Sequence, residues 1–217
     1  MSPTTTTLFR AGTVVIAPLV LLGAFVWHPF LPGRLPNDAA IAAAVAADPT
    51  RWGLAHVAAA VASAFVMLAF LAVRACLRDA GEGTWSALGL PLIIIGSTLY
   101  ALLPGMEFAP LAAVETGADA EAAQAALGPW FLPVLLTGAL AFGLGCLAFA
   151  KGIARAGVLG PRIGWLVVAA LVVVAVTRFI PLAAVQFYVQ SAALIVALWP
   201  LASVMRTQPL ERSAAQV

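Results

Sequence analysis

The chain has 217 residues, of which 63% are hydrophobic and 9% charged, and it has a formal net charge of +2 and a mean hydropathy of +1.05. Soluble domains carry roughly a quarter charged residues, so these few charges could not cover a soluble fold of this size, and a lipid bilayer is the predicted partner. Long unbroken runs of Ala, Leu, Val, Ile and Gly exclude a transmembrane barrel, and the single lysine, Lys151, leaves no polybasic surface for nucleic acid.

Six stretches are apolar and close to the length of about 20 residues that a membrane-spanning helix needs. They cover residues 9–28, 53–75, 84–103, 129–150, 162–178 and 181–204. The first leads into Trp27-His28-Pro29, which is a poor cleavage site, so we expect a retained helix rather than a signal peptide. The sequence therefore predicts an all-α, polytopic membrane protein: one domain over residues 1–217, built as a bundle of six transmembrane helices.

Arginine and lysine gather on one side of these spans. That side holds Arg10, Arg74, Arg78, Lys151, Arg155, Arg162, Arg206 and Arg212, and the other holds Arg34, Arg51 and Arg178. Tryptophan, which prefers the headgroup zone, falls at both boundaries: Trp27, Trp52 and Trp130 at the outer one, and Trp85, Trp165 and Trp199 at the inner one. The positive-inside rule then predicts a multi-pass protein of the inner (cell) membrane with both termini in the cytoplasm.

The two long outer loops are rich in alanine. Each opens with a capping-type residue and reaches a tryptophan at the start of the next span, over residues 37–52 and 117–130. We expect a short helix in each loop, and this likeness suggests a repeat of helices 1–2 in helices 3–4. In the first loop Ile41 and Val45 are four residues apart, so that helix has an apolar face that could lie on the membrane surface.

Small residues recur at four-residue spacing along the fourth span, as in Ala139 with Gly143 and Ala141 with Gly145. Lipid gives no hydrophobic drive for helix association, so these pairs predict close packing against neighbouring helices. The stretch 143–148 also matches the dinucleotide pattern G-x-G-x-x-A, but it lies inside an apolar span instead of between a strand and a helix. Cys76 and Cys146 are expected to be reduced, buried thiols.

The polar side chains of the spans gather in the outer half of the membrane. They are His28, His56, Tyr100, Glu107, Arg178, Gln186 and Gln190. Ionisable groups at this depth must pair with one another, reach water or hold something. The sequence therefore predicts an outward-facing polar pocket that binds a small ligand.

Other interpretations of the same residues stay open. His28, His56 and Glu107 are ordinary ligands of a transition metal, and the two histidines could hold a haem b iron from both sides, as in a membrane redox protein. Alternatively each polar group is an interfacial anchor, with Arg178 paired to Glu107 and the imidazoles facing headgroups or water. A separate, non-catalytic alternative is an accessory subunit of a larger membrane complex. No catalytic motif is present, so catalytic residues, enzyme activity and homo-oligomerisation are left open.

Three segments carry a resemblance to a known group. They are RWGLAHVAAA at 51–60, GMEF at 105–108 and FGLGCLAFAKGIARAGVLGPRIGWLVV at 142–168. With them the chain resembles the uncharacterised six-helix bacterial integral membrane proteins grouped as a domain-of-unknown-function family. Gly160 departs from the family form, which runs directly from Leu to Pro in the turn before the fifth helix. The resemblance implies a six-helix fold and no activity.

Overall fold

The computed structural model describes the backbone of residues 3–214 and the side chains of residues 5–207. Its helices are α1 (Pro3–Trp27), α2 (Asp38–Ala47), α3 (Pro49–Asp79), α4 (Thr84–Met106), α5 (Phe108–Thr116), α6 (Ala120–Ala156), α7 (Gly160–Thr177), the π-helical turn η1 (Val185–Val189) and α8 (Gln190–Ala214). Among the described residues the one β-type contact outside the helices is an isolated bridge between Arg34 and Leu182. The predicted all-α class is confirmed.

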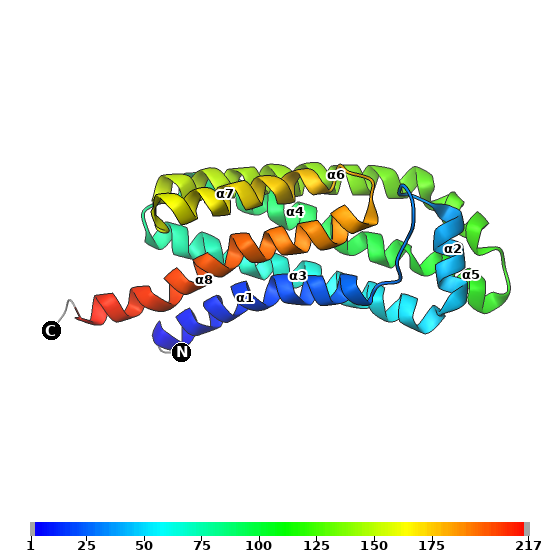
Figure 1. The fold of residues 1–217 in the computed structure, drawn as a ribbon, viewed down its shortest axis with the longest axis horizontal. Helices are drawn as coiled ribbons and strands as arrows, with labels where there is room; N and C mark the ends of the chain where they lie inside the picture. Colours follow the sequence, from blue (N-terminus) through cyan, green and yellow to red (C-terminus); the bar gives the residue numbers. More distant parts are fainter. Residues whose placement is uncertain (1–2, 215–217) are drawn as a thin grey trace.

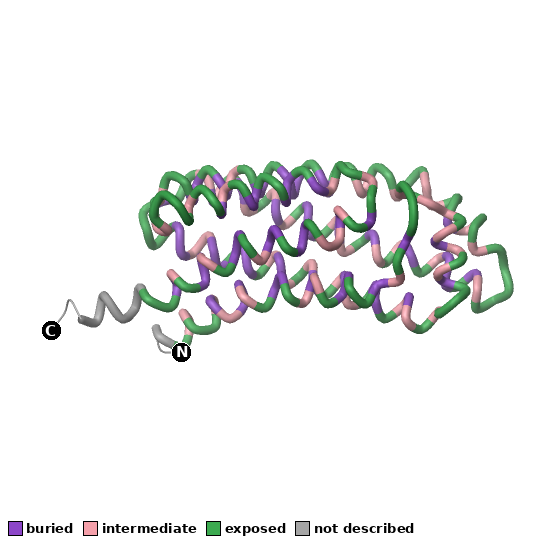
Figure 2. The backbone as a smooth tube through the Cα atoms, viewed as in Figure 1, coloured by how far each residue is buried: buried purple, intermediate pink, exposed green. Residues whose placement is uncertain are grey.

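Six of these helices are long and apolar enough to cross a membrane, which confirms the predicted number. They run side by side as an elongated bundle, with both ends of the chain at one end of it and α2 and α5 across the other (Figure 1). Neighbours in contact follow the order α1, α3, α4, α6, α7, α8 and back to α1, so the long helices form a closed ring. Buried residues follow the inward faces of this ring and exposed ones the outer surface (Figure 2).

The end of the bundle that lies away from the termini, which we call the distal end, is capped by short elements. The Asn37 side chain accepts from the Ala40 N–H at 3.1 Å and starts α2, while Asp48 accepts from the Arg51 N–H at 2.9 Å and starts α3. These are ordinary N-caps, which satisfy backbone donors that the helix leaves open. They fix the turn that brings α2 across the bundle end.

Two expectations about the loops are wrong. The alanine-rich stretch before Trp130 is not a separate helix but the first turns of α6, because Asp119 caps it and neither Pro129 nor Pro133 ends it. Proline is tolerated in membrane helices, where neighbouring groups satisfy the freed carbonyls. The apolar face of α2 does not lie on the membrane surface either, because Ile41 and Val45 are buried in a cluster with Trp52 and Leu111. The helix α2 therefore packs on the protein core and covers the distal end of the bundle.

Close packing of α4 on α6 is confirmed by the space around two glycines. A Cβ atom on Gly96 would lie 2.6 Å from the Cβ of Phe142, and one on Gly145 would lie 3.0 Å from the backbone N of Ile93. Backbone-to-backbone approach of this kind requires residues without side chains. This close contact holds α4 and α6 in one fixed arrangement, and both helices contribute residues to a cavity at the distal end.

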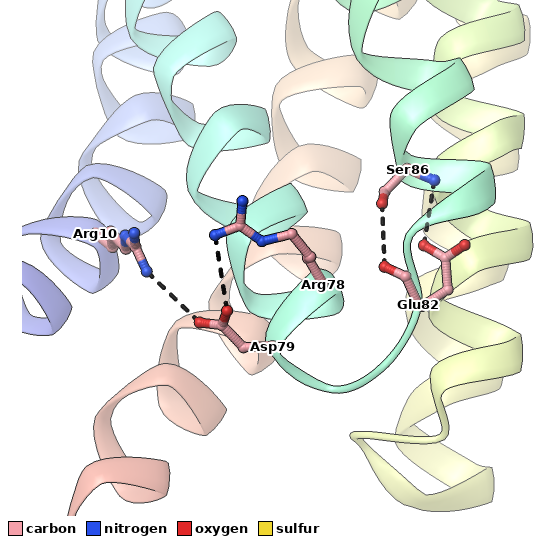
Figure 3. A network of polar contacts seen from close by, with 5 residues as sticks. All are labelled: Arg10, Arg78, Asp79, Glu82 and Ser86. Atoms are coloured by element: carbon pink, nitrogen blue, oxygen red, sulfur yellow. Dashed lines mark hydrogen bonds and ion pairs between the residues drawn. The ribbon is translucent and has the colours of Figure 1, made fainter.

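The opposite end of the bundle, at the α3–α4 connection, carries the surface ion pairs (Figure 3). Asp79 receives Arg10 at 3.7 Å and Arg78 at 3.9 Å. Glu82 accepts from the backbone N–H groups of Trp85 at 2.6 Å and Ser86 at 3.2 Å, and so caps the start of α4. Burial alone would raise the pKa of this carboxyl, but these hydrogen bonds prevail and hold the pKa below its usual value.

Candidate functional site

A cavity of about 450 Å³ lies inside the distal end of the ring. This volume is within the range of roughly 300–1,000 Å³ that small-molecule sites occupy. Six of the seven predicted ligand-binding residues line it: His28, His56, Tyr100, Glu107, Arg178 and Gln186. They come from α3, α4, η1 and the segments that follow α1, α4 and α7, so only the folded bundle brings them around one space.

Aromatic rings form one wall of this cavity. The His56 ring centre is 4.3 Å from that of Trp52 and 4.8 Å from that of His28. The His28 ring also meets the edge of Phe187 at 5.2 Å, and Phe187 stacks on Phe25 at 4.4 Å. Contacts of this kind fix ring orientations, so the wall is rigid and mostly apolar.

The backbone sets the tautomers of the two histidines. Nδ1 of His28 is 2.7 Å from the Pro29 carbonyl oxygen, and Nδ1 of His56 is 2.7 Å from that of Trp52. A carbonyl oxygen only accepts, so each Nδ1 carries the hydrogen and each Nε2 keeps its lone pair while the ring is neutral. His28 follows the end of the first span, and burial, with the Arg51 charge adding to it, lowers its pKa despite the opposing carbonyl bond. Both rings therefore offer Nε2 as a hydrogen-bond acceptor.

Glu107 is held by partners from two other helices. Its carboxylate Oε1 accepts from Nε2 of Gln124 at 3.3 Å, and its backbone carbonyl accepts from the Trp52 indole N–H at 3.0 Å. Its second oxygen, Oε2, is buried and has no hydrogen-bond partner among the described residues. A buried polar atom left in this state is costly, which marks it as a contact point for something else.

Arg178 lies over a ring and not beside a carboxylate. Its guanidinium carbon is 4.0 Å from the centre of the Tyr100 ring and 6.0 Å from that of Phe25. The ion pairs among the described residues are those of Asp79 at the other end of the bundle, so the alternative in which Arg178 pairs with Glu107 is not present. A cation–π contact is weaker than a desolvated counter-ion, and the charge of Arg178 is left without an anion.

Gln186 has a structural role next to this cation. Its Nε2 donates to the backbone carbonyl of Arg178 at 3.3 Å and to that of Ile180 at 3.0 Å. The Arg178 carbonyl lies at the C-terminal end of α7, where a helix leaves its carbonyls open, whereas the Ile180 carbonyl lies in the following turn and also accepts from the Leu182 N–H at 2.8 Å. The residue sits in the π-helical turn η1, a local distortion that is frequent at functional sites.

Gln190, the seventh predicted residue, lies one turn further along at a separate small void. This void, of about 10 Å³, is also lined by Ser97, Tyr100 and Arg178. Ser97 Oγ, Tyr100 Oη, Gln190 Oε1 and Arg178 Nε are buried there with no partner among the described residues. The void has the size of one water molecule, and a water there would have the polar neighbours it needs.

The geometry does not favour the metal and haem interpretations. No group of three or more His, Cys, Asp or Glu side chains within the described part of the chain has metal-binding spacing. Two imidazoles on opposite sides of an iron, each bonded at about 2 Å, would have ring centres further apart than the 4.8 Å between His28 and His56. The histidines are close together but not placed to bind one iron between them.

The cavity opens at one side of the bundle. Among its lining residues, Leu132, Leu136 and Phe179 are 41%, 55% and 51% exposed. Arg34 and Pro36, also exposed, border the opening on the loop that follows α1. The mouth is therefore apolar toward α6 and the end of α7, and cationic toward the loop.

Sequence reasoning missed several residues of this site. Trp52 was expected to be an interfacial anchor, but it is 1% exposed and contacts His56. Gln124 lies in the alanine-rich stretch and reaches Glu107 only because α6 packs beside α5. Its polarity within an apolar helix face is the one available signal, and nothing in the sequence separates Arg34 and Phe187 from ordinary loop and core residues.

No protein-family model, curated protein or solved structure matches this chain. The resemblance to a six-helix bacterial family therefore stays a prediction, and function rests on the geometry of the site.

Proposed function

We propose that this protein is a multi-pass membrane protein that binds a small amphipathic ligand in the distal cavity. The observation that carries the proposal is the convergence of polar side chains on a mostly apolar cavity of about 450 Å³; among them Glu107 has a buried oxygen without a partner, and Arg178 no counter-ion, within the described part of the chain. Sites for small molecules have this composition: a large apolar surface for affinity and a few fixed polar groups for orientation. A merely structural core would satisfy these polar atoms within the protein.

The proposed orientation places the cavity on the outer side of the membrane and both termini in the cytoplasm. It is supported by the excess of arginine and lysine on the side of the termini. A reporter fused to the C-terminus tests it: green fluorescent protein is expected to fluoresce, and alkaline phosphatase to be inactive. The reverse result would place the cavity on the cytoplasmic side.

The experiment on binding compares two substitutions on one helix. Ala59 lines the cavity and is buried, whereas Val61 is exposed on the outer surface of α3. Ala59→Phe fills part of the cavity, and Val61→Phe adds the same ring on the lipid side. Protein extracted from its native membrane is analysed by native mass spectrometry for bound small molecules.

We expect a bound mass in the wild type and in Val61→Phe, and its loss in Ala59→Phe. Equal occupancy in all three proteins would refute binding in this cavity. If no small molecule is found and a protein partner co-purifies in fixed stoichiometry, the accessory-subunit interpretation replaces this proposal.

A further inference from the structure

We infer that the ligand of the distal cavity is a single-chain amphiphile with an anionic headgroup, a carboxylate or a phosphate monoester, held by Arg178. This inference rests on the proposed function and names the class of ligand. The argument uses three features: the unpaired charge, the surroundings of that charge and the direction in which the cavity opens.

The first feature is the missing counter-ion. Arg178 lies over the Tyr100 ring with its guanidinium carbon 4.0 Å from the ring centre, and its Nε is buried without a partner among the described residues. A water in the small void beside Ser97 and Gln190 would satisfy Nε but would not neutralise the charge. Because Arg178 lines the main cavity as well, an anion in that cavity would supply the partner that the protein does not.

The second feature is the charge of the whole lining. Arg34 and Arg178 are the cationic side chains that line the cavity, and Glu107 is the acidic one. One carboxylate oxygen of Glu107 accepts from Gln124, its backbone carbonyl accepts from Trp52, and its side chain makes no ion pair with either arginine. The planar fork of a guanidinium matches carboxylate and phosphate oxygens in a bidentate manner, which favours these two headgroups over a neutral or cationic one.

The third feature is the apolar side of the mouth. Leu132, Leu136 and Phe179 line the cavity and are also exposed on the outer surface of the bundle. In a membrane that surface faces acyl chains. An apolar tail can therefore leave the cavity between α6 and the end of α7 without being exposed to water, while the headgroup stays at Arg178.

Trp52 reports on probes that enter the cavity. It lines the cavity and is 1% exposed, so probes that stay in the bilayer outside the protein do not contact it. The other five tryptophans of the chain are replaced by phenylalanine, and the protein is placed in phosphatidylcholine nanodiscs. Quenching of Trp52 fluorescence is titrated with 11-bromoundecanoate, 11-bromoundecyl phosphate and the neutral 11-bromoundecanol. Arg178→Met removes the charge, and Arg162→Met, at the exposed opposite end of α7, is the matched control.

We expect one or both anionic probes to quench Trp52 at a concentration at least about tenfold lower than the alcohol, as one charge-assisted contact implies. Arg178→Met is expected to remove this preference and Arg162→Met to retain it. If Arg178→Met does not fold, the comparison of anionic and neutral probes on the wild type still decides. Equal quenching by acid and alcohol would overturn the headgroup inference and leave the proposed function standing, whereas no quenching by any probe would overturn both.

Competition separates the sources of the anion. Displacement of the probes by lysophosphatidic acid added to the bilayer, and not by acetate or inorganic phosphate, would support the anionic headgroup and identify a single-chain membrane lipid as its source. Displacement by undecanoate alone would support a free single-chain acid. Displacement by acetate or inorganic phosphate at the same concentrations as the long-chain probes would overturn the amphiphile and indicate a site for a free anion.

Discussion

Replacing Arg178 by methionine is expected to stabilise the protein when no ligand is bound. The guanidinium is partly buried and has no counter-ion among the described residues, and its visible compensation is the Tyr100 ring at 4.0 Å. A desolvated cation–π contact contributes about 2 kcal/mol, whereas taking an ion out of water costs several kcal/mol, and apolar replacement of buried ionic groups often stabilises by about 1–4 kcal/mol. Since the cavity leaves part of the Arg178 charge hydrated, we expect a gain in unfolding free energy of about 1–2 kcal/mol.

The assay is unfolding in mixed micelles, followed by far-ultraviolet circular dichroism on protein that native mass spectrometry shows to carry no bound amphiphile. The gain corresponds to a rise of roughly 2–8 °C in Tm for a chain of this size. Arg162→Met, an exposed substitution at the other end of α7, is expected to change the unfolding free energy by no more than about 0.5 kcal/mol. A loss of stability in Arg178→Met with no change in Arg162→Met would mean that the guanidinium already has a stabilising partner, and the reasoning about an unpaired cation would be wrong.

Three further predictions concern the scaffold around the site. Gly96→Ala places a Cβ 2.6 Å from Phe142 and is expected to lower the unfolding free energy by about 1–3 kcal/mol. Gly164→Ala, with no neighbouring atom of the described residues within 4 Å of its Cβ position, is the control and is expected to be neutral or stabilising in the same unfolding assay. Equal effects of the two substitutions would refute the close α4–α6 contact. Glu82 has a lowered pKa in the folded state, so its stabilisation is present above about pH 4.5 and is lost as the pH falls through the folded pKa. Glu82→Gln is expected to lower stability by about 1 kcal/mol at pH 7, and the difference is expected to vanish once the pH is below the folded-state pKa. A difference independent of pH would argue against the cap. Gln186→Leu removes both hydrogen bonds to the end of α7 and is expected to cost about 1–3 kcal/mol and to speed amide exchange in the turn after α7; unchanged exchange would contradict that role.

The number of spans, the all-α class and six of the polar residues around the cavity could be predicted from the sequence. A helix must satisfy its own backbone in lipid, so uninterrupted apolar length is a direct signal of a span. Polar side chains in such spans are rare enough to stand out individually, which is why His56 and Arg178 were identified without knowledge of any contact. Outer-loop helices were harder to predict, because an alanine-rich sequence favours helix without showing where one helix ends and the next begins. The alanine-rich stretch before Trp130 is therefore part of α6 and not a separate helix.

The sequence by itself determined that the chain is a bundle of six apolar helices with its scarce polar groups near one end. Only the tertiary structure decided that Trp52 faces inward, that Gln124 takes one oxygen of Glu107 while the other has no partner, and that Arg178 lies on Tyr100 and not beside a carboxylate. Hydropathy and charge fix how deep a residue lies in the membrane, since depth is a matter of transfer free energy along one axis. The direction in which a side chain points around its helix, and hence which partner it meets, depends on how the helices pack against one another, and no pattern within a single helix contains that information.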